Sequence, residues 1–126
     1  LQSLKDESIH VITGFHIIEH LDFEVLMKMY TESLRVLKPG GLIIFETPNP
    51  KNLTVGACNF YTDPTHVNPI PPHTLEFMLQ EIGFINIEKR NLQSLEAIGT
   101  GNDYLNEYIN EWVNVSSDYA AIGYKA

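Results

Sequence analysis

The residues best suited to chemistry lie in one short pattern and one later loop. His16, Glu19 and His20 follow an H-x-x-E-H spacing, so on a helical turn they share one face. Imidazole and carboxylate groups suit a divalent cation, and His66 in the later loop would complete the ligand set. Without a metal, His20 or His66 would act as a general base, because an imidazole with an ordinary pKa of about 6.5 accepts a proton near neutral pH. In the competing interpretation, Glu19 and His20 only cap the following helix and bond to loop backbone.

Hydrophobic periodicity predicts the elements that must position these residues. A β-branched run over residues 9–13 predicts a buried strand, and apolar residues at steps of three and four predict a helix over residues 23–37. Asp22 is the expected helix cap, and the Pro-Gly-Gly turn that begins at Pro39 stops the helix. The apolar run over residues 42–46 then predicts a strand buried on both faces, which completes a βαβ unit.

The rest of the chain repeats this alternation after a long connection. Six prolines in residues 47–72 predict a loop, and a loop of that length inside a domain is usually functional. The later elements are a helix over residues 74–82 capped by Thr74 and ended by Gly83, a strand over 84–92, an amphipathic helix over 104–112 and a strand over 119–124.

Composition limits the class of protein. The chain has 126 residues, enough for one domain, and its formal net charge of -8 opposes nucleic-acid binding. The single cysteine, Cys58, fits a reducing compartment, so we expect a cytoplasmic protein. A membrane span needs roughly 20 consecutive apolar residues, and we expect none here.

Several motifs, in their order and spacing, resemble class I S-adenosylmethionine-dependent methyltransferases. They are residues 6–12 (DESIHVI), 15–21 (FHIIEHL), 37–44 (LKPGGLII), 47–50 (TPNP) and 81–84 (EIGF). The resemblance extends to about Leu92. It implies the α/β fold of the C-terminal half of a doubly wound, Rossmann-like sheet, with strands 4 to 7 and flanking helices. The final strand of that family lies antiparallel beside the fifth.

The resemblance also implies roles for individual residues. Gly14, Phe15 and His16 match the segment that contacts the cofactor S-adenosylmethionine. Some members of the family have an E-x-x-E-H motif with a later histidine and use a metal, which implies Mg, Mn or Zn at Glu19, His20 and His66. This sequence has His16 where that group has glutamate.

The substrate side of the site is assigned from the order of the strands. Ligands of wound sheets bind outside the carboxyl ends of the strands, where Pro48, Asn49 and Asn52 are expected. Proline and asparagine are also what a plain turn requires.

The family's glycine-rich cofactor turn does not occur before the first predicted strand. Residues 95–102 (LEAIGTGN) imitate it but have too few glycines and follow the wrong strand, so we interpret them as a plain loop. We therefore expect residues 1–126 to be a partial domain that lacks the N-terminal glycine-rich segment and was cut from a longer protein. Alone it should bind the cofactor weakly or not at all and be inactive, and its open sheet edge should favour self-association.

Three functions compete at this point. The first is O-methylation of a small molecule or of a surface-glycan sugar, and the sugar rests only on the resemblance of residues 63–72 (DPTHVNPIPP) to methyltransferases of polysaccharide assembly. The second is ribose O-methylation of RNA, which the metal-like motif permits and the acidic charge opposes. The third is a truncated, non-catalytic methyltransferase module.

Overall fold

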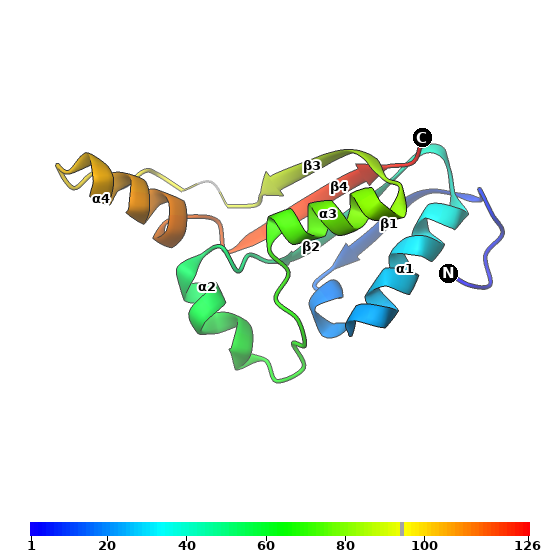
Figure 1. Cartoon of the computed structure of the whole chain (residues 1–126), viewed down its shortest axis with the longest axis horizontal. Helices are drawn as coiled ribbons and strands as arrows, with labels where there is room; N and C mark the ends of the chain where they lie inside the picture. Colours follow the sequence, from blue (N-terminus) through cyan, green and yellow to red (C-terminus); the bar gives the residue numbers. More distant parts are fainter. Residues whose placement is uncertain (94) are drawn as a thin grey trace.

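A mixed four-stranded sheet organises the chain. The computed structural model describes residues 1–93 and 95–126, and Figure 1 shows the arrangement. The strands are β1 (Ile9–Phe15), β2 (Leu37–Pro48), β3 (Ile85–Asn91) and β4 (Asp118–Tyr124). Their order is β1-β2-β4-β3; β1 and β2 are parallel, whereas β4 is antiparallel to both of its neighbours. The expected α/β fold is confirmed, and the final strand, β4, lies antiparallel beside β2, which corresponds to the fifth strand of the family.

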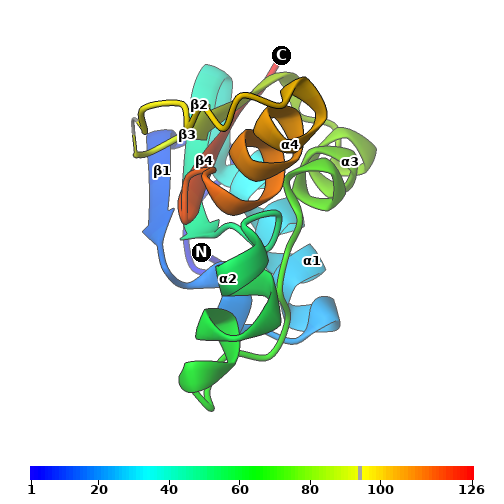
Figure 2. The ribbon, with the colours of Figure 1, turned by 90° about the vertical axis from the view of Figure 1, so that its left-hand side faces the viewer.

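Helices α1 (Phe23–Val36) and α3 (Pro72–Ile82) pack on one face of this sheet (Figure 2). The Asp22 side chain accepts a hydrogen bond from the backbone N–H of Val25, which confirms it as the cap of α1. Gly83 ends α3 with a φ of 117°, a left-handed conformation that suits glycine, as predicted. Both helices contribute to one buried cluster with the inner face of the sheet, in which Tyr30 and Leu79 are fully buried.

The predicted boundaries were wrong in three places. Strand β2 begins at Leu37, five residues before the expected start, because the Pro-Gly-Gly turn is included in the strand as an irregularity, with Gly40 at a φ of 77°. Helix α3 begins at Pro72, and Thr74 is not its cap, because proline is preorganised for the first turn. The segment 47–72 is not a plain loop. It contains α2 (Leu53–Ala57) and the 3-10 turn η2 (Asn59–Thr62), and another such turn, η1 (Ile18–His20), follows β1.

The last helical segment differs most from expectation. Helix α4 (Asp103–Tyr108) continues as a π-helical turn, η3 (Ile109–Val113), and projects away from the sheet (Figure 1). The apolar residues of this amphipathic segment are largely solvent-exposed, with 79% of Tyr104 and 42% of Trp112 accessible, because among the described residues the segment bonds mainly to its own preceding loop. The spacing of apolar residues predicts that they lie along one side of a helix, but it does not predict which other part of the protein covers that side.

Asparagines every four residues hold this segment to the preceding loop. The Asn106 side chain accepts from the backbone N–H of Thr100, Asn110 bonds to both backbone groups of Ile98, and Asn114 donates to the Glu96 carbonyl. Asn102 caps α4 by accepting from Leu105 N–H. This series of amide bonds, the asparagine ladder, replaces an apolar contact. Residues 95–102 form no helix or strand, in agreement with their interpretation as a loop.

Two surfaces of the sheet carry no helix from the described part of the chain. One is the face opposite α1 and α3 (Figure 2), and the other is the outer edge of β1, which pairs only with β2 within residues 1–93 and 95–126. Among these same residues, no helix is long and apolar enough to cross a membrane.

Gly14 tests how tightly β1 packs on β2. A Cβ built on Gly14 would lie 2.8 Å from the Phe45 ring, so Gly14→Ala forces the ring or the strand to move. We expect this substitution to lower the free energy of unfolding by about 1–3 kcal/mol in urea denaturation. Gly99→Ala is the matched control, because a Cβ there meets nothing within 4 Å. Equal stability of the two variants would show that the ring moves without cost.

Candidate functional site

The Glu19 carboxylate lies fully buried where β1 leads into η1. One carboxylate oxygen, Oε2, accepts a hydrogen bond from the Thr47 hydroxyl at 3.0 Å. The other, Oε1, is buried without a hydrogen-bond partner, although His16 Nδ1 lies 3.3 Å away and His20 Nε2 3.9 Å away. Removing a carboxylate from water costs several kcal/mol unless a charge or hydrogen bonds compensate it, so Oε1 faces a place that favours positive charge.

His20 and His66 lie near this oxygen, and hydrogen bonds to backbone carbonyls determine the tautomer of each ring. His20 Nδ1 lies 3.1 Å from the carbonyl oxygen of Thr65, and His66 Nδ1 lies 2.6 Å from that of Phe60. A carbonyl can only accept, so both rings carry their proton on Nδ1 when neutral. The lone pair therefore sits on Nε2 in each ring. The rings meet edge to face with centroids 4.8 Å apart.

Glu19, His20 and His66 form the acid-histidine cluster. One ligand-type atom from each residue lies within 4.8 Å of the others, as the spacing and the later loop predicted. The cluster joins two distant segments, because the Glu19 carbonyl accepts from the backbone N–H groups of Val67 and Asn68. A carboxylate oxygen beside two imidazole lone pairs can accept a proton or bind a cation.

Asp63 and Thr65 support the cluster from the loop. The Thr65 hydroxyl donates to Asp63 Oδ1 at 2.6 Å, and its oxygen lies 2.9 Å from His20 Nδ1. Hydrogen bonds from the Thr65 side chain and backbone hold the pKa of Asp63 below its usual range. Asp63 thus stays ionised, 3.6 Å from His66 Nε2.

The predicted cofactor residues lie at the end of β1. Gly14 is inside the strand and faces the Phe45 ring, so packing accounts for this glycine. Phe15 is 55% exposed and so is not a core residue. His16 has a left-handed backbone with a φ of 51° and bonds through Nε2 to Glu46 at 3.0 Å. His16 is therefore turned toward β2 and is not one of the three residues of the cluster.

The predicted substrate residues divide between two places. Pro48 lines a small cavity of about 210 Å³ together with Phe60 and His66. Asn49 and Asn52 are buried, and their amides donate to the carbonyls of Ser116 and Val115 at 2.9 and 2.7 Å. Their side-chain oxygens accept from nearby backbone N–H groups, so both the amide nitrogen and the oxygen of each side chain are bonded to the backbone around the turn.

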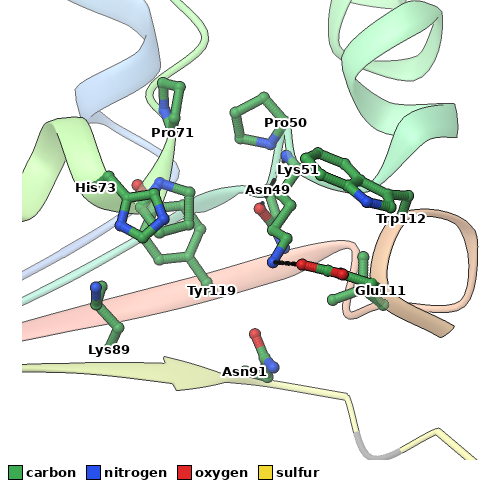
Figure 3. Close-up of a pocket in the computed structure, with 12 residues that line it drawn as sticks. Asn49, Pro50, Lys51, Pro71, His73, Lys89, Asn91, Glu111, Trp112 and Tyr119 are labelled. Atoms are coloured by element: carbon green, nitrogen blue, oxygen red, sulfur yellow. Dashed lines mark hydrogen bonds and ion pairs between the residues drawn. The ribbon is translucent and has the colours of Figure 1, made fainter. Parts of the chain in front are cut away.

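A larger cavity of about 630 Å³ opens at the same end of the sheet (Figure 3). Its walls come from the turn after β2, the start of α3, strand β3 and turn η3. They include Pro50, Lys51, His73, Lys89 and Trp112.

The sequence did not indicate this cavity, nor the roles of Thr47 and Thr65. A serine or threonine that hydrogen-bonds a site carboxylate or imidazole lies at no characteristic distance in the sequence from the residue it supports. The only available signal was the position of Thr47, directly after a buried strand, where site residues of wound sheets gather.

Comparison with known proteins agrees with this architecture. Residues 3–89 match the sequence profile of a family described as methyltransferase domain. A probable S-adenosylmethionine-dependent methyltransferase of Mycolicibacterium smegmatis is 32% identical over 81 residues. That alignment covers 64% of this chain and 30% of the relative, so the chain spans less than a third of the length of that relative.

Solved structures give the same result. A SAM-dependent methyltransferase from Archaeoglobus fulgidus superposes with a TM-score of 0.85 at 29% identity, covering 98% of this chain and 62% of that one. A second SAM-dependent methyltransferase, from Thermotoga maritima and described as a possible histamine N-methyltransferase, has a TM-score of 0.69 at 16% identity, covering 98% and 59%. The second likeness supports the fold alone. With the profile match and the strand order, these findings show that the chain belongs to the class I S-adenosylmethionine-dependent methyltransferases.

Proposed function

We propose that the natural full-length protein transfers a methyl group from S-adenosylmethionine to a hydroxyl of a small molecule or a surface-glycan sugar. The acid-histidine cluster is the observation that carries this proposal. It lies at the carboxyl end of β1 and β2, where wound sheets bind their ligands, and it presents two free imidazole nitrogens.

The cluster suits the handling of a hydroxyl proton. His20 Nε2 and His66 Nε2 each hold a lone pair that can accept the proton as the hydroxyl becomes nucleophilic. The nearby Glu19 carboxylate, 3.9 Å from His20 Nε2, stabilises the imidazolium that results. The loop carbonyls that hold both Nδ1 atoms keep the rings oriented, and orientation itself lowers the barrier. The cofactor supplies an electrophilic methyl group on its sulfonium.

The end of β1 fits the cofactor only in part. Phe15 and His16 present exposed or half-exposed side chains there, and Gly14, which has no side chain, can contribute only backbone atoms. These three residues form one wall, whereas the family's glycine-rich turn is absent from the sequence. We therefore propose that the 126-residue chain alone binds the cofactor weakly and is inactive.

Calorimetry and a methyl-transfer assay test the function. We expect the full-length protein to bind S-adenosylmethionine at least tenfold more tightly than the 126-residue chain, because only the longer protein would complete the cofactor wall. With labelled cofactor and a panel of phenols and sugars, His66→Gln in the full-length protein should lower kcat by about 10²–10⁴, the usual contribution of a general base. His10→Gln is the control, because His10 is exposed on β1 and contacts Lys38.

Each outcome of this experiment has a clear meaning. A full-length protein that neither binds the cofactor nor methylates any acceptor would favour a non-catalytic module. Tight binding by the chain alone would overturn the proposed weak binding. Methylation of RNA would replace the small acceptor.

We further propose that the cluster holds a divalent cation such as Mg, Mn or Zn. Glu19 Oε1 has no hydrogen-bond partner. His20 and His66 each donate the N–H of Nδ1 to a backbone carbonyl, as metal-binding histidines do with the nitrogen that is not a ligand. A cation held by these residues would lower the pKa of an acceptor hydroxyl.

Thermal melting of the chain with each ion tests the metal. At a concentration of about 100 Kd a bound ion adds about 2.7 kcal/mol, which should raise Tm by on the order of 10 °C. Glu19→Gln should abolish this rise and leave the metal-free protein as stable or more stable, because it removes a buried charge. Glu107→Gln, at an exposed site on α4, should retain the rise. No rise with any ion would leave His20 and His66 as bases without metal.

We also propose that the open edge of β1 allows the chain to self-associate. Among the described residues no strand pairs with its outer side, and Val11 on the same strand is 50% exposed. Light scattering of the 126-residue chain should show a mass that rises with concentration, and Val11→Lys should weaken this association about tenfold, since lysine protects edge strands. A concentration-independent monomer would contradict the proposal.

A further inference from the structure

The 630 Å³ cavity is separate from the acid-histidine cluster. Figure 3 shows its floor, made by Tyr119 and Asn49, with Trp112 at one end and His73 and Lys89 at the other. None of the described residues that line it belongs to the cluster, and the small cavity beside His66 has its own lining. A concave site of this size matches the range of small-molecule pockets.

The walls of the cavity are mainly rings and aliphatic carbon. Pro50, Pro71, Pro72 and Val115 line the cavity together with the indole of Trp112, a residue that is 42% exposed. An exposed indole beside prolines offers flat contact area with little conformational entropy to lose. The cavity therefore favours a flat, apolar ring.

The charges around the cavity are mostly positive. Lys51 and Lys89 line it, against the single carboxylate of Glu111, and His73 adds an imidazole that can hydrogen-bond an anion. In a chain with a net charge of -8, this is a local reversal of sign. A ligand that carried a negative group would be held here and disfavoured over most of the remaining surface.

Both lysines are already paired, but weakly. Lys51 Nζ lies 3.4 Å from Glu111 and 5.4 Å from the centre of the Trp112 ring, and Lys89 pairs with Glu76 outside the cavity. These groups are between a quarter and a half exposed, and ion pairs of that kind contribute little. An entering anion can share or replace either partner.

Two polar side chains on the floor of the cavity are already bonded. The amide and carbonyl of Asn49 are both bonded, and the Tyr119 hydroxyl donates to the Ile70 carbonyl at 2.7 Å. Burial raises the pKa of Tyr119, so that hydroxyl stays neutral. A sugar needs a partner for each hydroxyl, whereas an aromatic ring needs none.

We infer that this cavity binds an aromatic carboxylate, with its ring against Trp112 and the prolines and its carboxylate toward Lys89 and His73. This site goes beyond the proposed methyl transfer, since it uses neither the cofactor wall nor the acid-histidine cluster. The positive rim supplies the selectivity for the anion, and the apolar wall supplies the selectivity for the ring.

Trp112 makes the test direct, because it is the only tryptophan in the chain. In a ¹H–¹⁵N spectrum its single indole N–H peak reports on the cavity. We expect benzoate to shift this peak saturably. Neutral benzyl alcohol should bind with an affinity at least fivefold lower, and acetate should cause no shift. Glucuronate, an anionic sugar without an aromatic ring, should bind at least fivefold more weakly than benzoate.

Neighbouring residues on β3 provide matched variants. Lys89→Gln should weaken benzoate binding about fivefold, which is within the range of one partly exposed ion pair. Arg90→Gln removes the same charge from an adjacent residue that pairs with Glu88 and does not line the cavity, so it should leave the affinity unchanged. His66→Gln should also bind benzoate normally, which separates this site from the proposed catalytic one.

Four results would overturn the inference. The first is no shift with benzoate up to about 10 mM, a concentration at which even a weak site fills. The second is equal affinity for benzoate and benzyl alcohol, and the third is an equal loss of affinity in the Lys89→Gln and Arg90→Gln variants. The fourth is tighter binding of glucuronate than of benzoate, which would reject the aromatic ring.

Discussion

The rest of the site depends on one buried carboxylate. Glu19 has no exposed surface, yet its side chain receives only the Thr47 hydroxyl, while its main-chain carbonyl binds Val67 and Asn68. These bonds join the end of β1, the end of β2 and the proline-rich segment at one point. Because an ionised group in such a place is costly, the surrounding structure must supply compensating charge. Glu19 therefore both brings these three segments together and determines which charges are favoured beside them.

The carboxyl end of the sheet is divided into two compartments of opposite chemistry. On one side, His20 and His66 present imidazole nitrogens around a negative oxygen. On the other, prolines and Trp112 form an apolar cavity with a positive rim. The turn that begins at Asn49 lies between them. The side-chain amides of Asn49 and Asn52 hold this turn in place by donating hydrogen bonds to the backbone carbonyls just before β4. One sheet edge can therefore discriminate between ligands by polarity as well as by shape.

Sequence patterns predicted the parts of the molecule that local physics determines. The Asp22 cap and the Gly83 terminus were correct because each is decided by neighbouring residues. The predicted grouping of Glu19 and His20 with His66 from the later loop was correct. His16, from the same H-x-x-E-H pattern, instead bonds through Nε2 to Glu46. The exposure of the helix around Trp112 could not be predicted, because it depends on which surface lies beneath the helix. The supporting role of Thr65 likewise arises only when distant segments meet.

The asparagine ladder gives the segment that carries α4 a different source of stability from the rest of the protein. The sheet is held by buried apolar area, whereas this segment is held by amides bonded to the loop of Ile98 and Thr100. Bonds that face solvent exchange readily with water, and segments with little apolar burial unfold locally at a lower free energy than the core. The segment should therefore detach as its own cooperative unit while the sheet stays intact. Since Trp112 belongs to this segment, the larger cavity should lose one of its walls whenever the segment unfolds locally.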